Sequence, residues 1–371
     1  MRFSMVSALM AAAATGVAAG VTPFLPHAVR ADPPTKVKRD VAALATDTGF
    51  AAVGKINTGP FPADLNGSNK TYTWPVHTFE FESNGAALQM AYMDVPPCCM
   101  PNGKTLMMLH GKNFCSETWR DQIYHFTEMG FRVLALDNLG FCKSSKNATM
   151  QYSLAFQVWA YKGLLDALNL DTVVLMGHSY GGMLGTMFSF LMPQSIELFV
   201  SLDAIGAEPY TGAGLKYAPI DANIKQEASS NTASITGYES LYYYVGDMPD
   251  AAKEWVDMLN NIYWGSERNS FIQIQARIVD IVLTQPTTSY YPLITVPTFF
   301  TWGEKDLTYI GQWDPNMNGK LGNWKEFAPK VCASMKNCTA HQFDTYGHST
   351  QVSNPPLYNQ VTGDWIFSAM A

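Results

Sequence analysis

Apolar runs of strand length alternate with helical patterns along this chain from residue 86 onward. The strand candidates are 87–95, 105–110, 131–138, 172–176, 196–206, 296–306 and 339–348. Helical patterns lie between several of them, at 116–130, 152–170 and 180–192, and a last helix closes the chain. Alternation of this kind is typical of βαβ units. We therefore predict an α/β fold with a mostly parallel central sheet flanked by helices.

The alternation is interrupted between residues 207 and 291. This segment contains polar loops and aromatic helical stretches, such as YESLYYYVGDMPDAAKEWVDMLNNIYW (238–264), but no convincing strand. In an open α/β sheet, an insertion at this place lies over the carboxyl ends of the strands, where ligands bind. We interpret 207–291 as a helical lid over a binding site.

The N-terminus has the layout of a secretory signal peptide over residues 1–31. An arginine is followed by an alanine-rich apolar run and then by small residues, and cleavage is plausible near Ala31. The alternative is an uncleaved membrane anchor, although alanine and glycine are weakly apolar for a spanning helix. Lys38 and Arg39 offer a dibasic site for removal of a short propeptide. Residues 32–84 are expected to be a lead-in segment, and the protein to be secreted, or periplasmic if its source is bacterial.

Composition limits the kind of partner. The 371 residues are 47% hydrophobic and 15% charged, which allows a sizeable core, and the formal net charge is −7. No basic cluster lies outside one short N-terminal run, so neither nucleic acid nor an anionic membrane is an expected partner. A small neutral or weakly polar molecule fits this composition better.

An exported chain can keep disulfides, and six cysteines is an even count. Cys332 and Cys338 are close enough in sequence to clip a loop, whereas the adjacent Cys98 and Cys99 are expected to pair elsewhere or to stay free. No pair has the Cys-x-x-Cys spacing of a zinc site, so no metal is expected. Asn-x-Ser/Thr sequons would be glycosylated on the surface if the host is eukaryotic; they lie at Asn66, Asn69, Asn147 and Asn337.

Ser179 stands in the stretch GHSYGG (177–182), directly after the apolar run TVVLM. A nucleophile elbow requires a buried strand, a turn tight enough to raise the serine hydroxyl above the sheet, and a helix that begins at once. Gly177 and Gly181 lack a Cβ where such a turn crowds the strand against the helix. The alternative is a glycine-rich turn that merely contains a hydroxyl. The context favours Ser179 as a nucleophile.

Other short motifs follow the predicted strands: LHGKNF (109–114), DNLGFCKSS (137–145), WGEKD (302–306) and YGHST (346–350). With GHSYGG they make the chain resemble the α/β-hydrolase superfamily from about residue 85 to the end, in the superfamily's order Ser, Asp, His. The resemblance implies a hydrolase core formed by 85–206 and 292–371. Dehalogenases and epoxide hydrolases of this fold use an aspartate at the elbow, so the serine favours acyl-type chemistry.

The resemblance also implies a role for each candidate residue. A serine hydroxyl is a poor nucleophile until a base takes its proton, and a neutral imidazole is suited to that near pH 7. His348 is the candidate base. A carboxylate must hold the imidazole in the right tautomer. We favour Asp306 for this role, with Asp203 after the preceding strand as the alternative.

Negative charge that develops on a substrate oxygen needs fixed N–H donors. In the enzymes that the chain resembles, the donors are the residue after the nucleophile and the residue after an earlier His-Gly pair, here Tyr180 and Lys112. Cys115 and Cys142 lie just past this loop and in the neighbouring loop. They either form a disulfide across the floor of the site or remain two buried thiols.

The leading hypothesis is a secreted serine hydrolase that cleaves a carboxylic ester or lactone through an acyl-enzyme, without a cofactor. Two alternatives remain open: the same residues acting on an amide, a thioester or a carbon–carbon bond next to a carbonyl, and a catalytically idle binding protein. An apolar or aromatic substrate is expected if the aromatic residues of the lid line a pocket rather than only pack the lid onto the core. These residues are Tyr242, Tyr243, Tyr244, Trp255, Tyr263 and Trp264.

Overall fold

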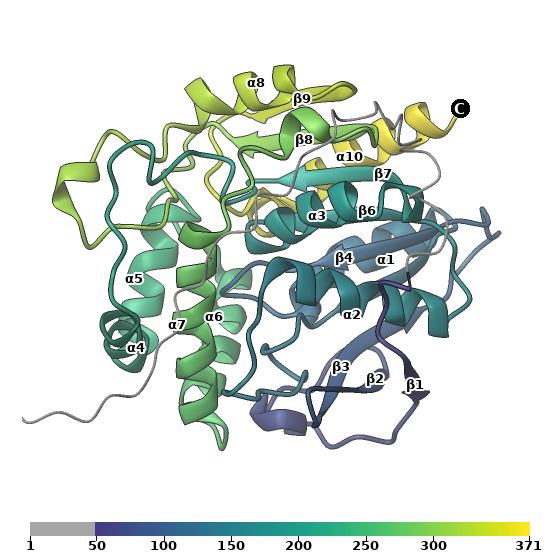
Figure 1. The fold of residues 1–371 in the computed structure, drawn as a ribbon. Helices are drawn as coiled ribbons and strands as arrows, with labels where there is room; N and C mark the ends of the chain where they lie inside the picture. Colours follow the sequence, from purple (N-terminus) through teal and green to yellow (C-terminus); the bar gives the residue numbers. More distant parts are fainter. Residues whose placement is uncertain (1–48) are drawn as a thin grey trace, which may run out of the picture. The chain divides into compact units, whose positions relative to one another are not determined.

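The computed structural model describes residues 49–371, and a nine-stranded sheet lies at the centre of this part of the chain (Figure 1). Its strand order is β1-β2-β3-β5-β4-β6-β7-β8-β9. Pairing is antiparallel from β1 to β5 and parallel from β5 to β9. The sheet is therefore mostly parallel, with an antiparallel edge at the N-terminal side.

The elements have the following bounds. The strands are β1 (Gly54–Asn57), β2 (Val76–Ser83), β3 (Ala86–Val95), β4 (Thr105–Leu109), β5 (Arg132–Leu136), β6 (Val173–His178), β7 (Ile196–Leu202), β8 (Thr298–Gly303) and β9 (Cys338–Phe343). The helices are α1 (Arg120–Glu128), α2 (Leu154–Ala167), α3 (Tyr180–Leu191), α4 (Ile220–Ala228), α5 (Thr232–Tyr242), α6 (Asp250–Tyr263), α7 (Arg268–Thr284), α8 (Trp324–Ser334), α9 (Thr350–Ser353) and α10 (Pro355–Met370).

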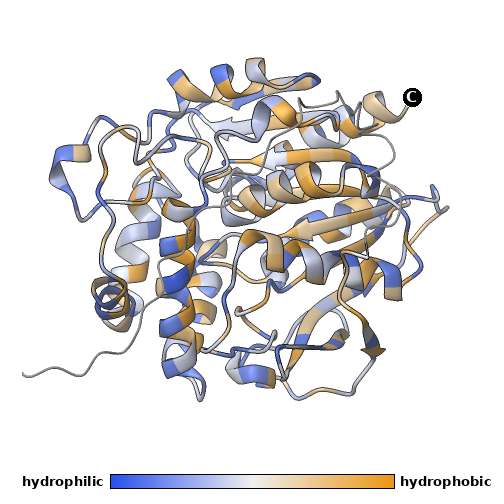
Figure 2. Ribbon diagram, in the orientation of Figure 1, coloured by the Kyte–Doolittle hydropathy of each residue, from blue (hydrophilic) through white to orange (hydrophobic). Residues whose placement is uncertain are grey.

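Helices cover both faces of the sheet. The adjacent helices α2 and α3 lie in front of it in Figure 1, and α1 and α10 pack together behind it. Strands β4, β6 and β8 are buried along their whole length, and the central strands are mainly orange in Figure 2. Burial on both faces is the reason that these strands read as continuous apolar runs in the sequence.

The predicted fold class is confirmed, and each strand expected from residue 87 onward is present. The sequence interpretation missed β1 and β2, which lie within the segment expected to be a lead-in. In β2 the buried Phe79 and Phe81 alternate with the more exposed Glu80 and Glu82. Such alternation is typical of a strand with one face on the core. The described part of the lead-in is therefore an integral edge of the sheet.

The four helices α4 to α7 follow β7 and precede β8, within the interval expected to be helical. They lie together at one end of the sheet, and α4 packs on α7 while α6 packs on both α5 and α7 (Figure 1). The buried side chains of α6 recur at helical spacing; they are Ala252, Trp255, Val256, Met258, Leu259, Ile262 and Tyr263. One apolar face therefore holds this insertion together.

Two of the cysteine pairs form disulfides, Cys115–Cys142 and Cys332–Cys338. Cys98 and Cys99 are exposed and free. The sequon at Asn66 has its side-chain nitrogen engaged, because Nδ2 donates to the carbonyl of Lys143 at 2.6 Å. The expected signal peptide (1–31) and the dibasic pair at 38–39 lie outside the described residues.

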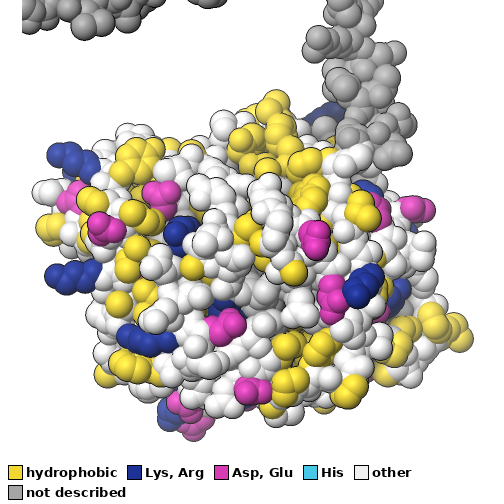
Figure 3. Space-filling model, turned by 60° about the horizontal axis from the view of Figure 1, so that its bottom comes forward, with side chains coloured by type: hydrophobic (Ala, Val, Ile, Leu, Met, Phe, Trp, Pro, Cys, Tyr) yellow, Lys and Arg dark blue, Asp and Glu magenta, His cyan; other side chains and the backbone are white. Residues whose placement is uncertain are grey.

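On the face drawn in Figure 3, lysines and arginines are interspersed with acidic side chains among the described residues. Within residues 49–371, no helix combines the length and the apolar character needed to cross a membrane.

Candidate active site

Three predicted site residues meet where parallel strands end. Ser179 follows β6, Asp306 lies beyond β8, and His348 lies beyond β9. His348 Nε2 is 2.8 Å from Ser179 Oγ, and His348 Nδ1 is 2.6 Å from Asp306 Oδ2. All three residues are buried. Because each ring nitrogen of the imidazole faces one partner, the carboxylate fixes the tautomer that leaves Nε2 free to accept the serine proton.

Ser179 sits on a sharp turn between strand and helix. Its backbone has φ 55° and ψ −115°, a conformation that a side-chain-bearing residue rarely adopts. A Cβ on Gly177 would lie 2.4 Å from the carbonyl oxygen of Gly181, and a Cβ on Gly181 would lie 2.1 Å from that of Leu109. The glycines are therefore required by close backbone contact, and the turn lifts the hydroxyl toward His348.

Replacing Gly181 by alanine is expected to destabilise the protein on the order of 3 kcal/mol, because the added methyl meets backbone atoms that cannot move aside. The free energy of unfolding from urea denaturation measures this loss. Gly237→Ala is the matched control: this exposed glycine lies inside α5, and no atom of the described residues comes within 4 Å of the added Cβ. There alanine is expected to be neutral or to stabilise by up to about 1 kcal/mol. Equal effects of the two substitutions would contradict the close-contact argument.

The insertion helps to position His348, which sequence reasoning did not foresee. The backbone N–H of His348 donates to the carbonyl of Tyr242 at the end of α5, at 3.3 Å. The Tyr243 ring lies 4.9 Å from the imidazole, centroid to centroid. The His178 ring also lies 4.9 Å from the imidazole, and its Nε2 is 2.7 Å from the His348 carbonyl oxygen. Burial, with the nearby His348 ring, lowers the pKa of His178 well below its ordinary value, so His178 is neutral and donates this hydrogen bond.

Both candidate acids lie near the imidazole, but only Asp306 contacts it through a recorded hydrogen bond. Asp306 Oδ1 accepts from the backbone N–H of Thr308 at 2.7 Å, which leaves Oδ2 for His348. Asp203 instead accepts from the backbone N–H of Gly303 at 2.9 Å. The geometry therefore favours the arrangement expected from the sequence.

The two expected oxyanion donors are available. Within residues 49–371, the backbone N–H groups of Lys112 and Tyr180 donate to no recorded protein acceptor. A Cβ on Gly111 would lie 3.0 Å from Ser179 Cβ, so the loop that carries Lys112 runs directly beside the serine. The Tyr180 side chain is buried and stacks on Phe141. Only its backbone is therefore placed to meet a ligand.

A cavity of about 780 Å³ opens on Ser179. It is lined by the oxyanion loop and by the insertion, including Ile235, Tyr243 and Tyr263. The Lys112 ammonium is 2.8 Å from a carboxylate oxygen of Glu227 on α4, and the hydroxyl of Tyr263 donates to the other oxygen. No sequence pattern indicates this ion pair, because its members are far apart along the chain. The walls are thus mixed: apolar and aromatic side chains line the cavity together with charged ones, among them this ion pair.

The aromatic residues of the insertion divide between two roles. Tyr243 and Tyr263 line the cavity. Trp255 packs outside it, beneath the cations of Lys70 and Arg120. Trp264 is 58% exposed and lies against Arg268. Some of these aromatic residues therefore line the pocket, and others pack against the rest of the protein.

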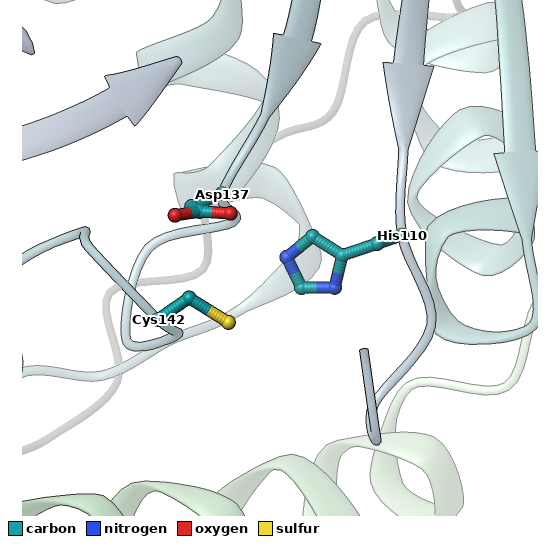
Figure 4. Close-up of side chains that lie close together, drawn as sticks. All are labelled: His110, Asp137 and Cys142. Atoms are coloured by element: carbon teal, nitrogen blue, oxygen red, sulfur yellow. The ribbon is translucent and has the colours of Figure 1, made fainter. Parts of the chain in front are cut away.

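A second cluster of buried polar side chains lies at the neighbouring strand ends (Figure 4). His110, Asp137 and Cys142 have potential ligand atoms within 4.8 Å of one another. The sulfur of Cys142 is bonded to Cys115 and is not a thiolate. Asp137 accepts from the hydroxyl of Tyr72 and from backbone N–H groups of the loops that carry the disulfide, at 2.7 to 2.9 Å. This cluster holds those loops in place beside the site.

The α/β fold carries a serine on a strained strand–helix turn. A buried histidine and a buried aspartate lie at adjacent strand ends. This combination is typical of a hydrolase-type scaffold. A family model described as the alpha/beta hydrolase fold matches residues 104–355. The chain belongs to this family.

Relatives extend the comparison. The chain is 33% identical in sequence to a probable hydrolytic enzyme from Pseudomonas aeruginosa PAO1 whose crystal structure superposes with a TM-score of 0.77, over 79% of this chain and 95% of that one. It is 24% identical to a protein of Stutzerimonas stutzeri named as a carbamate hydrolase, over 72% of this chain and 92% of the relative. An epoxide hydrolase from Caballeronia sordidicola is 23% identical, over 55% of this chain and 57% of the relative.

Proposed function

We propose that this protein is a serine hydrolase that cleaves a carboxylic ester or lactone through an acyl-enzyme. The observation that carries the proposal is the continuous chain of contacts from Ser179 Oγ through His348 to Asp306. In the first half-reaction His348 Nε2 takes the serine proton while Oγ attacks the substrate carbonyl. Asp306 stabilises the charge of the imidazolium that forms. The imidazolium then protonates the leaving alcohol.

The oxyanion of each tetrahedral intermediate would be bound by the backbone N–H groups of Lys112 and Tyr180. In the second half-reaction His348 takes a proton from water, which attacks the acyl-enzyme, and the imidazolium returns this proton to Ser179 Oγ as the acid is released. The free backbone donors beside Ser179 support this step. No cofactor takes part in the proposed reaction.

The serine distinguishes between the activities named among the relatives. Epoxide hydrolases of this fold open the ring with an aspartate at the elbow, whereas this chain has Ser179. Carbamate cleavage, like ester cleavage, is attack on a carbonyl carbon. The second candidate is therefore hydrolysis of a carbamate or related amide by the same residues, which the named carbamate hydrolase relative favours.

The direct test is reaction of the purified protein with a fluorophosphonate probe, followed by peptide mapping. Labelling at Ser179 supports an activated nucleophile, and absence of labelling favours an idle binding protein. Initial rates on a p-nitrophenyl ester, a lactone and a carbamate then separate the two candidate functions, because the preferred substrate has the highest kcat/KM.

We further propose that α4 to α7 act as the lid of this site and set its preference for acyl length. On p-nitrophenyl esters, KM is expected to fall by up to about fourfold per added methylene from acetate to hexanoate, since each buried methylene contributes about 0.8 kcal/mol. Ile235→Ala should weaken this dependence, because Ile235 is buried on the cavity wall. Leu241→Ala is the control, since Leu241 lies on the same helix, α5, but is 56% exposed. A KM that does not vary with chain length would count against the proposal.

A further inference from the structure

Asp203 is a fully buried carboxyl group with one unsatisfied oxygen. It follows β7 with φ 44°, and its backbone N–H donates to the carbonyl of Thr301 at 2.9 Å. Oδ1 accepts from the backbone N–H of Gly303, whereas Oδ2 has no hydrogen-bond partner in the part of the chain that the structure describes. An ionised carboxylate without donors on one oxygen is costly inside a protein. The proposed reaction gives this group no role.

The neighbour of Asp203 is Asp306, the carboxylate that contacts His348 in the proposed reaction. One carboxylate oxygen of Asp203, one of Asp306 and a ring nitrogen of His348 all lie within 4.8 Å of one another. Two carboxylates so close together cannot both be ionised without strong repulsion. Asp306 accepts from two donors, Thr308 N–H and His348, whereas Asp203 accepts from one. The negative charge therefore settles on Asp306, and the extra proton on Asp203.

We propose that Asp203 is a positioning residue that keeps its proton and donates it in a hydrogen bond to Asp306, so that the pair presents one negative charge to His348. Burial and the charge of Asp306 raise the pKa of Asp203 well above its ordinary range. The inference rests on the proposed function, because it assigns Asp203 to the support of the Ser179–His348–Asp306 system. It also explains how both acid positions considered from the sequence coexist in one site.

Other titratable groups face this pair. His348 lies beside both carboxyl groups, and the buried hydroxyl of Tyr358 on α10 is near enough to Asp203 to interact with it. Glu208 interacts with Asp306, and burial raises the pKa of Glu208 to about 7. A pH profile must therefore separate Glu208 from Asp203. The measurements below are made in the native sequence and repeated in a Glu208→Gln background.

The kinetic test compares Asp203→Asn and Asp203→Ala on one p-nitrophenyl ester between pH 5 and 9. Asparagine is neutral and offers an N–H donor to Asp306 while its oxygen still accepts from Gly303. We expect kcat of Asp203→Asn to stay within about threefold of the native value. The acidic limb of its kcat/KM profile should shift by no more than about 0.3 pH units, because no charge changes near His348. Alanine removes the donor, and kcat is expected to fall about tenfold or more.

A different result overturns the proposal. If Asp203 were ionised, Asp203→Asn would remove a negative charge beside the imidazole and move the acidic limb down by about one pH unit or more. A loss of more than tenfold in Asp203→Asn would likewise contradict a neutral donor. If Asp203→Ala fails to fold, the asparagine profile decides alone.

The thermal test does not depend on catalysis. An acid whose pKa is raised by folding makes the native state lose stability as pH rises from its unfolded value, about 4, toward its folded value. Asp203→Asn removes this loss. The quantity to compare is the thermal midpoint of Asp203→Asn minus that of the unsubstituted protein. We expect this difference to be at least about 2 °C larger at pH 8 than at pH 5. A difference that does not change with pH contradicts the retained proton. Because this result is independent of Ser179, it separates failure of the inference from failure of the proposed function.

Discussion

Ser179→Ala is expected to lower kcat for ester hydrolysis by a factor on the order of 10⁶, the loss seen when a serine hydrolase loses its nucleophile. Covalent labelling by a fluorophosphonate should disappear with it. Within the described residues 49–371, the Ser179 side chain hydrogen-bonds only to His348, so the thermal midpoint should change by no more than about 2 °C. His348→Ala should cause a similar loss, and the double variant should be no worse, because these residues act as a unit.

Ser189→Ala is the control for this measurement. Ser189 is equally buried and lies on the helix that follows the elbow, and its hydroxyl has no hydrogen-bond partner among residues 49–371. Its removal should leave kcat and labelling unchanged. A Ser179→Ala protein that stays within tenfold of the native rate, after contaminating esterase has been removed, would refute the proposed mechanism.

Asp306→Asn is expected to reduce kcat by about 10⁴-fold at pH 7, because an amide in place of the carboxylate stabilises the wrong imidazole tautomer. The shape of the site is retained, so KM should change much less than kcat. Initial rates on one ester at pH 7 and 9 measure the effect. Asp344→Asn provides a control, since Asp344 is exposed and follows β9, away from the recorded contacts of His348.

The assignment of the acid is wrong if Asp306→Asn stays within about tenfold of the native rate while Asp203→Asn loses activity by orders of magnitude. In that case His348 would depend on the carboxyl group after β7. The recorded contact between His348 Nδ1 and Asp306 Oδ2 argues for the opposite result.

Most of the fold could be predicted because its signals are local. Strands buried on both faces, such as β4 and β6, appear as continuous apolar runs in any reading of the sequence. The strands β1 and β2, on the antiparallel side of the sheet, were missed, because β1 is short and β2 alternates between buried and exposed positions. That weaker pattern resembles the loops around it. The fate of Cys115 and Cys142 was also left open, since a disulfide depends on the approach of two separate loops.

By itself, the sequence determined the α/β architecture, the elbow at Ser179 and the candidate base, because strand patterns, close-packed glycines and motif order are properties of neighbouring residues. Only the tertiary structure brought Asp306 rather than Asp203 into contact with His348, set Tyr243 against the imidazole and paired Lys112 with Glu227. Each of these contacts joins segments that are distant along the chain, and their meeting depends on how helices and loops pack around the sheet. The same packing buries Asp203 and Asp306 close together, and in our proposal the two donors to Asp306 are the reason that this carboxyl group bears the charge.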